Sequence, residues 1–381
     1  MQRFTINGEQ SFWGDKCSER YRKAVRAERE PVIEDLVEFR RERLLAGYDP
    51  EAGSGPVVGI PLAMSTYDWA PFWLAAFRAL DVRVRLSEPT TNQTVTLGLD
   101  SIISEPCFPI QVAHGHIRWL FDHGADLVFV PNNISAPGDP KAKPSFFCPW
   151  NQTLPFVARQ AAHIAEHADR ILTPTLWFHL GRAAVAGALR ESLASAGIRR
   201  GAREVERAID AGFDALEAFR RDLQAAGRRA LETLEREEEH GVLLLGRPYN
   251  MYDKGANLDI ATKLRKYYGA NVIGLDFLEL DEARGEVPDS MFWDYGAKIL
   301  AAAAFARAYP RLHIIYITNF KCGPDSYVKH YVAEASGRPF LSLQFDGHNN
   351  DAGMLTRCEA YLDSKGVLRR WDVRERRAIA S

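Results

Sequence analysis

The segment Gly241-Val-Leu-Leu-Leu-Gly-Arg-Pro248 is an uninterrupted apolar run followed by an arginine and a proline. A short apolar run bounded by turn-forming residues is typical of a strand buried on both faces of a parallel sheet. Helix-like and strand-like segments alternate after it, with helices at 258–268, 295–308 and 330–336 and strands at 271–275, 312–318 and 339–343. This alternation predicts a parallel, helix-covered α/β domain over residues 241–381.

Residues 56–180 repeat this alternation, with strands expected at 57–63, 82–86 and 125–131 and helices at 67–80, 114–123 and 156–166. Residues 1–55 are expected to form an N-terminal helical arm, with its helix at 28–45. Residues 181–240 are expected to form a helical connecting segment, whose long helix at 204–239 carries one apolar stripe. We therefore predict the fold class α/β, with two Rossmann-like parallel-sheet domains and a helical insert between them.

The composition limits the classes of function. The chain has 381 residues, of which 46% are hydrophobic and 26% charged, as expected for a folded protein with two or three domains. A net charge of −2 gives no basic field for nucleic acid. The sequence has neither an apolar stretch of about 20 residues nor an apolar signal core at its N-terminus, so a cytoplasmic protein without a membrane span is expected. Five cysteines, an odd number, argue against a disulfide scaffold.

Several common enzyme motifs are missing from the sequence. It contains no Gly-x4-Gly-Lys-Ser/Thr loop for nucleotide phosphates and no Gly-x-Gly-x-x-Gly fingerprint for a dinucleotide. Cys-x-x-Cys pairs and the Gly-x-Ser-x-Gly nucleophile motif are absent as well. We therefore expect that the chain alone does not hydrolyse ATP.

Three cysteines each follow an apolar run and have proline nearby. They are Cys107 in Ser-Glu-Pro-Cys-Phe-Pro, Cys148 in Ser-Phe-Phe-Cys-Pro-Trp and Cys322 in Asn-Phe-Lys-Cys-Gly-Pro-Asp. If each run is a strand that gives way to a loop, the thiols reach the edge of the sheets where ligands bind in α/β domains. Thiols delivered to one such edge could hold an iron–sulfur cluster. The alternative is that they are small buried hydrophobic residues.

Five stretches in the same order resemble a known family. They are Gly59-Ile-Pro-Leu-Ala-Met-Ser-Thr-Tyr67 with Pro71-Phe-Trp73, the Cys107 segment with Ala113-His-Gly-His116, Gly246-Arg-Pro-Tyr249, Thr318-Asn-Phe-Lys-Cys-Gly-Pro-Asp325, and the C-terminal Asp346-Gly-His348 with Thr356-Arg-Cys-Glu-Ala. Together they are similar to motifs of the activator-related, activase-like proteins of the 2-hydroxyacyl-CoA dehydratase system. The resemblance runs from about residue 1 to residue 365.

The resemblance implies a cofactor. Related modules hold a cluster of the 4Fe-4S type in the cleft between two α/β domains on three widely spaced cysteines. Carried over to this sequence, the ligands are Cys107, Cys148 and Cys322, with the loop around Cys148 the loosest match. Such a cluster would make the protein oxygen-sensitive, and an iron without a protein ligand would be open to a substrate.

The resemblance also implies partners. Larger relatives are fused to an ATPase domain of the acetate-kinase/hsp70/actin type, for which this chain has no room. A separate ATP-hydrolysing activator of that type is therefore expected to drive electrons into the cluster. Because such activators are dimeric in the family, a homo-oligomer or a two-fold complex is expected, with an acyl-CoA or another small molecule as substrate.

Other residues are candidates for supporting roles. Asn319, Asp325 and His348 are expected to bind the cofactor by polar contacts around it, although Asn and Asp in such loops are often only turn formers. Arg247 and Tyr249 either face the cleft or pack at its edge. Cys17 is a candidate fourth ligand and Cys358 a buried structural thiol. His114 and His116 are expected near a helix start, capping it or lining the cleft, and Trp69 and Trp73 in the core.

The predicted function is electron transfer. The chain would accept low-potential electrons and either relay them or use them, as a reductase or dehydratase component, to reduce a small molecule. The competing hypothesis is a scaffold or binding protein without enzymatic activity, whose cysteines are structural.

Overall fold

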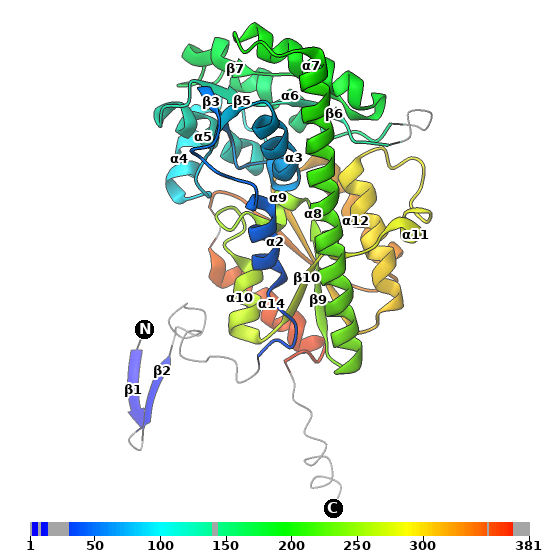
Figure 1. Ribbon diagram of the computed structural model, residues 1–381. Coiled ribbons are helices and arrows are strands. Elements are labelled where there is room, and N and C mark those ends of the chain that lie inside the picture. The colour runs from blue at the N-terminus through cyan, green and yellow to red at the C-terminus, as the bar shows by residue number, and fades with distance from the viewer. Residues whose placement is uncertain (1, 7–8, 14–29, 139–143, 349, 369–381) are drawn as a thin grey trace, which may run out of the picture.

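The computed structural model describes residues 2–6, 9–13, 30–138, 144–348 and 350–368. Its framework is two four-stranded parallel sheets with helices around them (Figure 1), which confirms the predicted α/β fold class. The first sheet has the order β4-β3-β5-β7 and the second the order β10-β9-β11-β12. Their strands are β3 (Ser54–Ile60), β4 (Val82–Leu86), β5 (Leu127–Phe129), β7 (Ile171–Leu172), β9 (Gly241–Gly246), β10 (Asn271–Gly274), β11 (Leu312–Asn319) and β12 (Leu341–Phe345).

The two sheets share one strand order. In each, the first strand along the chain lies in the middle, between the second and the third. The second strand along the chain therefore pairs with one edge of the first strand, and the third strand pairs with its other edge. In such sheets the crevice at the carboxyl ends of the first and third strands is the usual place for a ligand. The fold offers two such places, at the ends of β3 and β5 and at the ends of β9 and β11.

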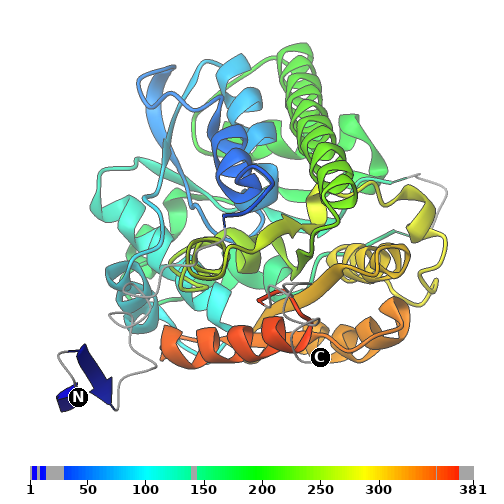
Figure 2. The same ribbon diagram turned by 90° about the horizontal axis from the view of Figure 1, so that it is seen from below.

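The second sheet explains why residues 241–246 are uniformly apolar. All six residues of β9 and all eight of β11 are buried, because helices pack on both faces of the sheet. In Figure 2, α8 lies on one side of the molecule and α13 and α14 on the opposite side. The helices around this sheet are α2 (Leu36–Leu45), α9 (Pro248–Tyr252), α10 (Ile260–Tyr268), α11 (Asp281–Arg284), α12 (Asp294–Phe305), α13 (Gly323–Ser336) and α14 (Asp351–Ser364), with short 3₁₀ turns η3 (Leu275–Phe277) and η4 (Ala306–Ala308).

The first sheet is surrounded by shorter elements. The aromatic helix α3 places Trp69 and Trp73 in the core, each 2% exposed, as predicted. Helices α4 and α5 pack closely where Gly98 and Gly115 leave room for each other's backbone. The elements are α3 (Thr66–Ala79), α4 (Asn92–Ser101), α5 (Phe108–Asp122), α6 (Pro149–Ala158), α7 (Arg182–Ser195), the paired strands β6 (Asn132–Ser135) and β8 (Thr175–Trp177), the 3₁₀ turns η1 (Ala165–Arg170) and η2 (Phe178–Leu180), and a separate hairpin of β1 (Gln2–Ile6) and β2 (Glu9–Trp13).

One long helix runs along both sheets; the part of the molecule around the first sheet is called the first domain below, and the part around the second sheet the second domain. Helix α8 (Ala202–Arg236) has 35 residues and is about 52 Å long at 1.5 Å per residue. It packs on α3 in the first domain and on η3 in the second (Figure 1). The predicted apolar stripe is buried except for Phe213, which is half-buried. At Gly212 the helix meets the Phe72 ring of α3, and at Gly227 it meets the backbone carbonyl of Phe277, so a Cβ would press chiefly on a side chain at the first position and on backbone at the second.

Three helices begin earlier than the sequence periodicity predicted. Helix α5 begins at Phe108 instead of 114, α6 at Pro149 instead of 156, and α13 at Gly323 instead of 330. Each has a proline in its first or second position, where the fixed φ of proline suits a helix and its missing N–H costs nothing. These prolines therefore start helices.

The N-terminal arm is described in part, and the connecting segment in full. Helix α2 falls within the predicted range 28–45, of which residues 28 and 29 lie outside the described part of the chain. Among the described residues, no helix is both long enough and apolar enough to cross a membrane.

Candidate functional site

The three motif cysteines occupy the same position in three helices. Cys107, Cys148 and Cys322 are the N-cap residues of α5, α6 and α13. Only Cys322 follows a strand of a sheet, three residues after β11, so the expectation that all three follow strands was wrong for the other two. The first N–H groups of a helix have no partner inside the helix and carry its partial positive charge. All three thiols therefore lie where a helix favours an anion.

The fold brings these thiols together at the contact between the domains. Each cysteine is 7% exposed. Burial, followed by the effect of the neighbouring Cys148 thiol, raises the pKa of the Cys107 thiol to about 12. Burial also raises the pKa of Cys322, followed by the effects of Asp325 and, more weakly, of Cys107. Tyr249 lies within the electrostatic reach of all three thiols.

Backbone amides oppose this effect at two of the thiols. The N–H of Ile110 lowers the pKa of Cys107, and the N–H of Asp325 lowers that of Cys322. Each amide belongs to the third residue of its helix, so the two sites have the same local geometry. Burial outweighs the amides, and both cysteines are therefore thiols rather than thiolates at neutral pH.

The loops that carry the cysteines are tied across the domain boundary. Lys321 forms an ion pair with Glu105, which joins the Cys322 loop to the Cys107 loop. The Phe146 N–H donates to Phe292 O at 2.7 Å, and the Asp294 N–H donates to Phe146 O at 3.0 Å. These bonds connect the Cys148 loop to the start of α12, so each first-domain cysteine is held against the second domain.

A buried ion pair lies beside the thiols. Arg247 follows β9 and is 1% exposed, and its Nε donates to Asp325 Oδ1 at 2.9 Å. The other oxygen of Asp325 accepts from Thr318 Oγ1 at 2.7 Å. Burial alone would lower the pKa of Arg247, but Asp325 and the nearby Tyr249, Cys322 and Cys148 raise it well above its usual value. Arg247 is therefore a permanent positive charge beside the cysteines.

Three buried donors around the cysteines have no hydrogen-bond partner in the described part of the chain. They are Arg247 Nη2, Asn250 Nδ2 and Asn151 Nδ2. Asn250 belongs to α9 and accepts from Asn319 Nδ2 at 3.2 Å through its oxygen, and Asn151 lies three residues after Cys148. An unsatisfied buried donor costs roughly 1–3 kcal/mol. Because Asn319 Oδ1 is the one unpartnered acceptor described beside these three donors, the site offers a guest more donors than acceptors.

The predicted supporting residues divide into two groups. Asn319, 4% exposed, and Asp325, 1% exposed, lie beside Cys322 at the end of β11. The side chain of His348, in contrast, is 92% exposed, and its Nδ1 lies 4.0 Å from Asp346 Oδ1. His348 lies on the surface after β12 rather than among the buried groups.

Other singled-out residues lie away from the thiols or outside the described residues. Cys358 is fully buried in α14, as expected, and Cys17 lies outside the described part of the chain. His114 and His116 are in the middle of α5 instead of at its start. His116 bonds Ser87 Oγ at 2.8 Å and Thr90 Oγ1 at 2.9 Å, so it belongs to a polar network described below.

The sequence interpretation missed two residues of the site. Asn151 and Asn250 were not selected, although each lies within three residues of a residue that was. Asn151 is in the first turn after Cys148, and Asn250 follows the Gly-Arg-Pro-Tyr motif directly. Once Cys148 is seen as a helix start, Asn151 falls within the turn nearest to the thiol, which was the missing signal.

The arrangement is not a site for a single ion. Among the described residues, no three side chains of His, Cys, Asp or Glu are grouped so that they could hold one metal ion. The thiols nevertheless influence one another's pKa. They therefore lie within electrostatic reach of one another.

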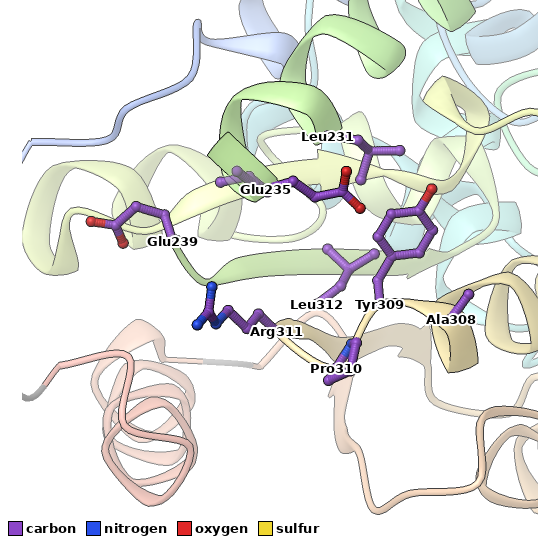
Figure 3. A pocket seen from close by; sticks show the side chains of 9 residues that line it. Leu231, Glu235, Glu239, Ala308, Tyr309, Pro310, Arg311 and Leu312 are labelled. Carbon is purple, nitrogen blue, oxygen red and sulfur yellow. The ribbon is translucent and has the colours of Figure 1, made fainter. Parts of the chain in front are cut away.

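A cavity lies at the ends of the strands opposite the cysteine site. It has a volume of about 400 Å³ between the end of α8 and the starts of β9 and β11 (Figure 3). Glu235 and Tyr309 point toward one another across it, and burial together with the Glu235 carboxylate raises the pKa of Tyr309. No cysteine lines this cavity, and it therefore does not belong to the site.

The comparisons with known proteins assign the family. Residues 57–278 match the family described as the CoA enzyme activase uncharacterised domain. No curated protein matches the chain. The matched region includes the first sheet, α8 and the first two strands of the second sheet, with Cys107 and Cys148 but not Cys322. Because this region covers more than half of the 381 residues, the chain belongs to the CoA enzyme activase uncharacterised domain family.

Proposed function

We propose that Cys107, Cys148 and Cys322 hold an iron–sulfur cluster of the 4Fe-4S type between the two domains. The single observation that carries this proposal is the convergence of three helix N-termini, each capped by a cysteine, on one buried place. Three thiolates and a cluster are anionic, and the helix termini offer partial positive charge to them. No other arrangement of the described cysteines brings three thiols within electrostatic reach of one another.

The surroundings fit such a group. Arg247 supplies a full positive charge that its pKa keeps in place. The unpartnered donors Arg247 Nη2, Asn151 Nδ2 and Asn250 Nδ2 would have sulfur acceptors. Hydrogen bonds to sulfur and nearby positive charge are among the factors that tune such clusters. The residues present are therefore compatible with an anionic cluster.

The chain's own residues would control protons and water at the site. Because burial raises the pKa of Cys107 and Cys322, metal loading must release their protons, and loading is expected to improve as the pH rises. Tyr249 and Tyr295 are 5% and 3% exposed and pack edge to face at 6.2 Å, so they exclude water on the side of α9 and α12. When bound, the cluster would supply single low-potential electrons.

The family membership suggests where the electrons come from. We propose that a separate ATP-hydrolysing activator delivers them and that this chain relays them, or uses them to reduce a small molecule such as an acyl-CoA. An enzyme that depends on CoA substrates is the proposed partner downstream. An assembly with two-fold symmetry is part of the same proposal.

The decisive experiment is anaerobic reconstitution with iron and sulfide. We expect about four irons per chain, a brown colour and a cluster EPR signal after reduction. The single variants Cys107→Ala, Cys148→Ala and Cys322→Ala should each lose most of the iron. The matched control is Cys358→Ala, which removes an equally buried thiol from α14 and should keep it.

Two results would contradict the proposal. Iron that survives in the variant lacking all three cysteines would show binding elsewhere. A colourless wild-type protein after reconstitution would favour the scaffold hypothesis, in which the cysteines are structural. Cluster reduction by the activator to the same extent with and without ATP would leave the cluster in place and refute only the proposed electron donor.

A further inference from the structure

A second polar cavity lies next to the cysteine site without including any cysteine. It has a volume of about 220 Å³ and is lined by the start of α3, the middle of α8, the loops after β9 and β10 and the start of α12. Gly246 and Pro248, which flank Arg247, form part of its wall. The volume corresponds to about seven water molecules at ~30 Å³ each. The cavity could therefore hold a molecule of a few heavy atoms.

Two buried polar atoms of lining residues have no hydrogen-bond partner in the described structure. They are the hydroxyl of Tyr295, a residue 3% exposed, and Oδ2 of Asp68, a residue 7% exposed. Lys298 Nζ lies 3.9 Å from Asp68 Oδ2, beyond hydrogen-bond distance. Burial raises the pKa of Tyr295 well above its usual value, so its hydroxyl keeps its proton and remains a donor. The cavity thus offers one free donor and one free acceptor.

The third free group is a cation. Arg220 of α8 lines the cavity, is half-buried, and lies with its guanidinium carbon 5.9 Å from the centre of the Trp69 ring. The ion pairs found among the described residues include none for Arg220 within 4.0 Å. No hydrogen bond from its guanidinium is found in that part of the chain either, although its charge acts on the Asp294 carboxylate. Arg220 is therefore available to an anionic group of a ligand.

The other charged groups that line the cavity are Lys298, Arg284, Asp276 and Asp281, of which the first two share the Asp294 carboxylate. Lys298 Nζ lies 2.8 Å from Asp294 Oδ2, and Arg284 Nη2 lies 3.7 Å from Asp294 Oδ1. Asp276 is paired with Arg40 from outside the cavity. Arg220 on α8 and the unpartnered Asp68 oxygen on α3 both line the cavity, so a ligand that carries a negative and a positive group would complement them.

We propose that this cavity binds a small zwitterion, such as a free α-amino acid. Its carboxylate is bound by Arg220 and by the Tyr295 hydroxyl, and its ammonium group donates to Asp68 Oδ2. The three contacts come from α8, α12 and α3, so the ligand bridges both domains and the long helix. This site goes beyond the proposed electron-transfer function and does not depend on it, because no cysteine lines the cavity.

The test is calorimetric titration of the full chain, without added iron, with the standard amino acids one at a time. We expect saturable binding of small ones such as glycine, alanine or serine. The matched probes are glycolate, which keeps the carboxylate but replaces the ammonium with a hydroxyl, and ethylamine, which lacks the carboxylate. Both are expected to bind at least about tenfold more weakly, because each loses a charge-assisted contact.

Variants connect the binding to the named groups. Tyr295→Phe removes only a hydroxyl and should weaken binding about tenfold, and Asp68→Asn and Arg220→Gln should weaken it by roughly 10- to 100-fold. The controls are Tyr361→Phe, which loses a hydroxyl on α14, and Arg221→Gln, which removes the exposed neighbour of Arg220. Both should bind as the wild type does.

Three results would overturn the proposal. The first is no saturable binding of any standard amino acid to the folded wild-type protein. The second is glycolate binding as tightly as glycine, because Asp68 Oδ2 would then not distinguish an ammonium group from a hydroxyl. The third is unchanged affinity in Tyr295→Phe, because this conservative variant should fold normally and lacks only the proposed contact.

Discussion

The two sheets have the same strand order, yet the ends of their central strands differ in chemistry. After β3 the chain continues as Pro61-Leu-Ala-Met64, and all four residues are buried. After β9, at the equivalent place, it continues with Arg247, which is paired with Asp325 and lies beside the cysteines. One topology therefore produces an apolar crevice in the first domain and a charged one in the second.

This difference shows that the strand order determines where the crevice lies but not which side chains line it. The first domain does not deliver its cysteines from strand ends. It uses the N-termini of α5 and α6, which face the end of β11 in the second domain. The first domain thus contributes helix ends, and the second contributes the charged crevice against which they lie.

The largest expected effect comes from removing the charge that distinguishes the second crevice. Arg247→Met leaves Asp325 buried with Thr318 as its remaining side-chain partner. Breaking a buried ion pair in this way costs about 3–5 kcal/mol. Urea unfolding of the protein without iron should show this loss in the free energy of unfolding.

The double variant Arg247→Met/Asp325→Asn sharpens this test. With both charges gone, the second crevice resembles the first, and at least half of the lost stability should return. A cost below about 1 kcal/mol for the single variant would mean that water reaches Asp325, contrary to its 1% exposure.

The next effect compares how the two domains pack on α8. Gly227→Ala places a Cβ against the backbone carbonyl of Phe277 in the second domain, which cannot rotate away. We expect a loss of about 1–3 kcal/mol, measured by thermal or urea unfolding. Gly212→Ala, on the first-domain side, meets the edge of the Phe72 ring at 2.9 Å and Phe72 O at 3.0 Å.

The Gly212 variant is the matched control, because both changes replace a helical glycine with alanine. Alanine gains about 1 kcal/mol of helix propensity, and the Phe72 ring can shift, so Gly212→Ala should stay within about 1 kcal/mol of the wild type. Equal losses in the two variants would show that the two contacts are equally rigid.

A third prediction concerns the polar network that joins the domains. Thr90 Oγ1 of the first domain donates to Asp253 Oδ2 of the second at 2.6 Å, and it also contacts His116. Burial raises the pKa of Asp253 to about 6 and lowers that of His116 to about 3. Compared with the unfolded chain, the folded state therefore favours the protonated form of Asp253 and the neutral form of His116.

These two groups have opposite effects on stability as the pH falls. The His116 contribution is complete above its unfolded pKa of about 6.5 and is lost as the pH falls toward 3. The Asp253 contribution is absent well above pH 6 and grows as the pH falls through 6 toward 3.8. Between pH 7 and 5 the titration of His116 lowers the free energy of unfolding by about 2 kcal/mol, and the titration of Asp253 raises it by about 1 kcal/mol.

Asp253→Asn removes the compensating group. Its free energy of unfolding should fall between pH 7 and 5 by about 1 kcal/mol more than that of the wild type. Urea unfolding at a series of pH values measures this slope. Parallel curves for the variant and the wild type would contradict the assignment of the titration to Asp253.

The smallest effect is expected on the surface. Lys321→Gln breaks the ion pair with Glu105 that joins the two cysteine loops, but both side chains are exposed. The variant should lose less than about 1 kcal/mol, and this loss should disappear in high salt. A large loss that persists in salt would show that the loops depend on this contact.

The sequence was sufficient for the framework and for part of the site. The apolar runs of β9 and β11 and the helical periodicity of α8 predicted the α/β class and the order of its elements, because burial on both faces leaves a uniform signal. The three cysteines were selected from their flanking residues, and the fold places them within electrostatic reach of one another, while their role as ligands stays a prediction.

What could not be predicted depends on contacts distant in the chain. The pairing of Arg247 with Asp325 joins residues 78 positions apart, and no local pattern encodes it. The cavity of Tyr295, Asp68 and Arg220 combines three elements whose relative placement follows only from the packed fold. The helix starts, in contrast, were predictable, since a cysteine followed by a proline at the first or second position is an N-terminal signal.

Helix α8 has a mechanical consequence for both proposed sites. One continuous helix of 35 residues packs closely on α3 near Gly212 and on η3 near Gly227, so it connects the two domains rigidly. The two domains cannot separate unless this helix bends or one of these two contacts breaks. Access to the thiols is therefore expected through movement of the short loops around Glu105 and Lys321, and the spacing between the domains is set in advance by the helix.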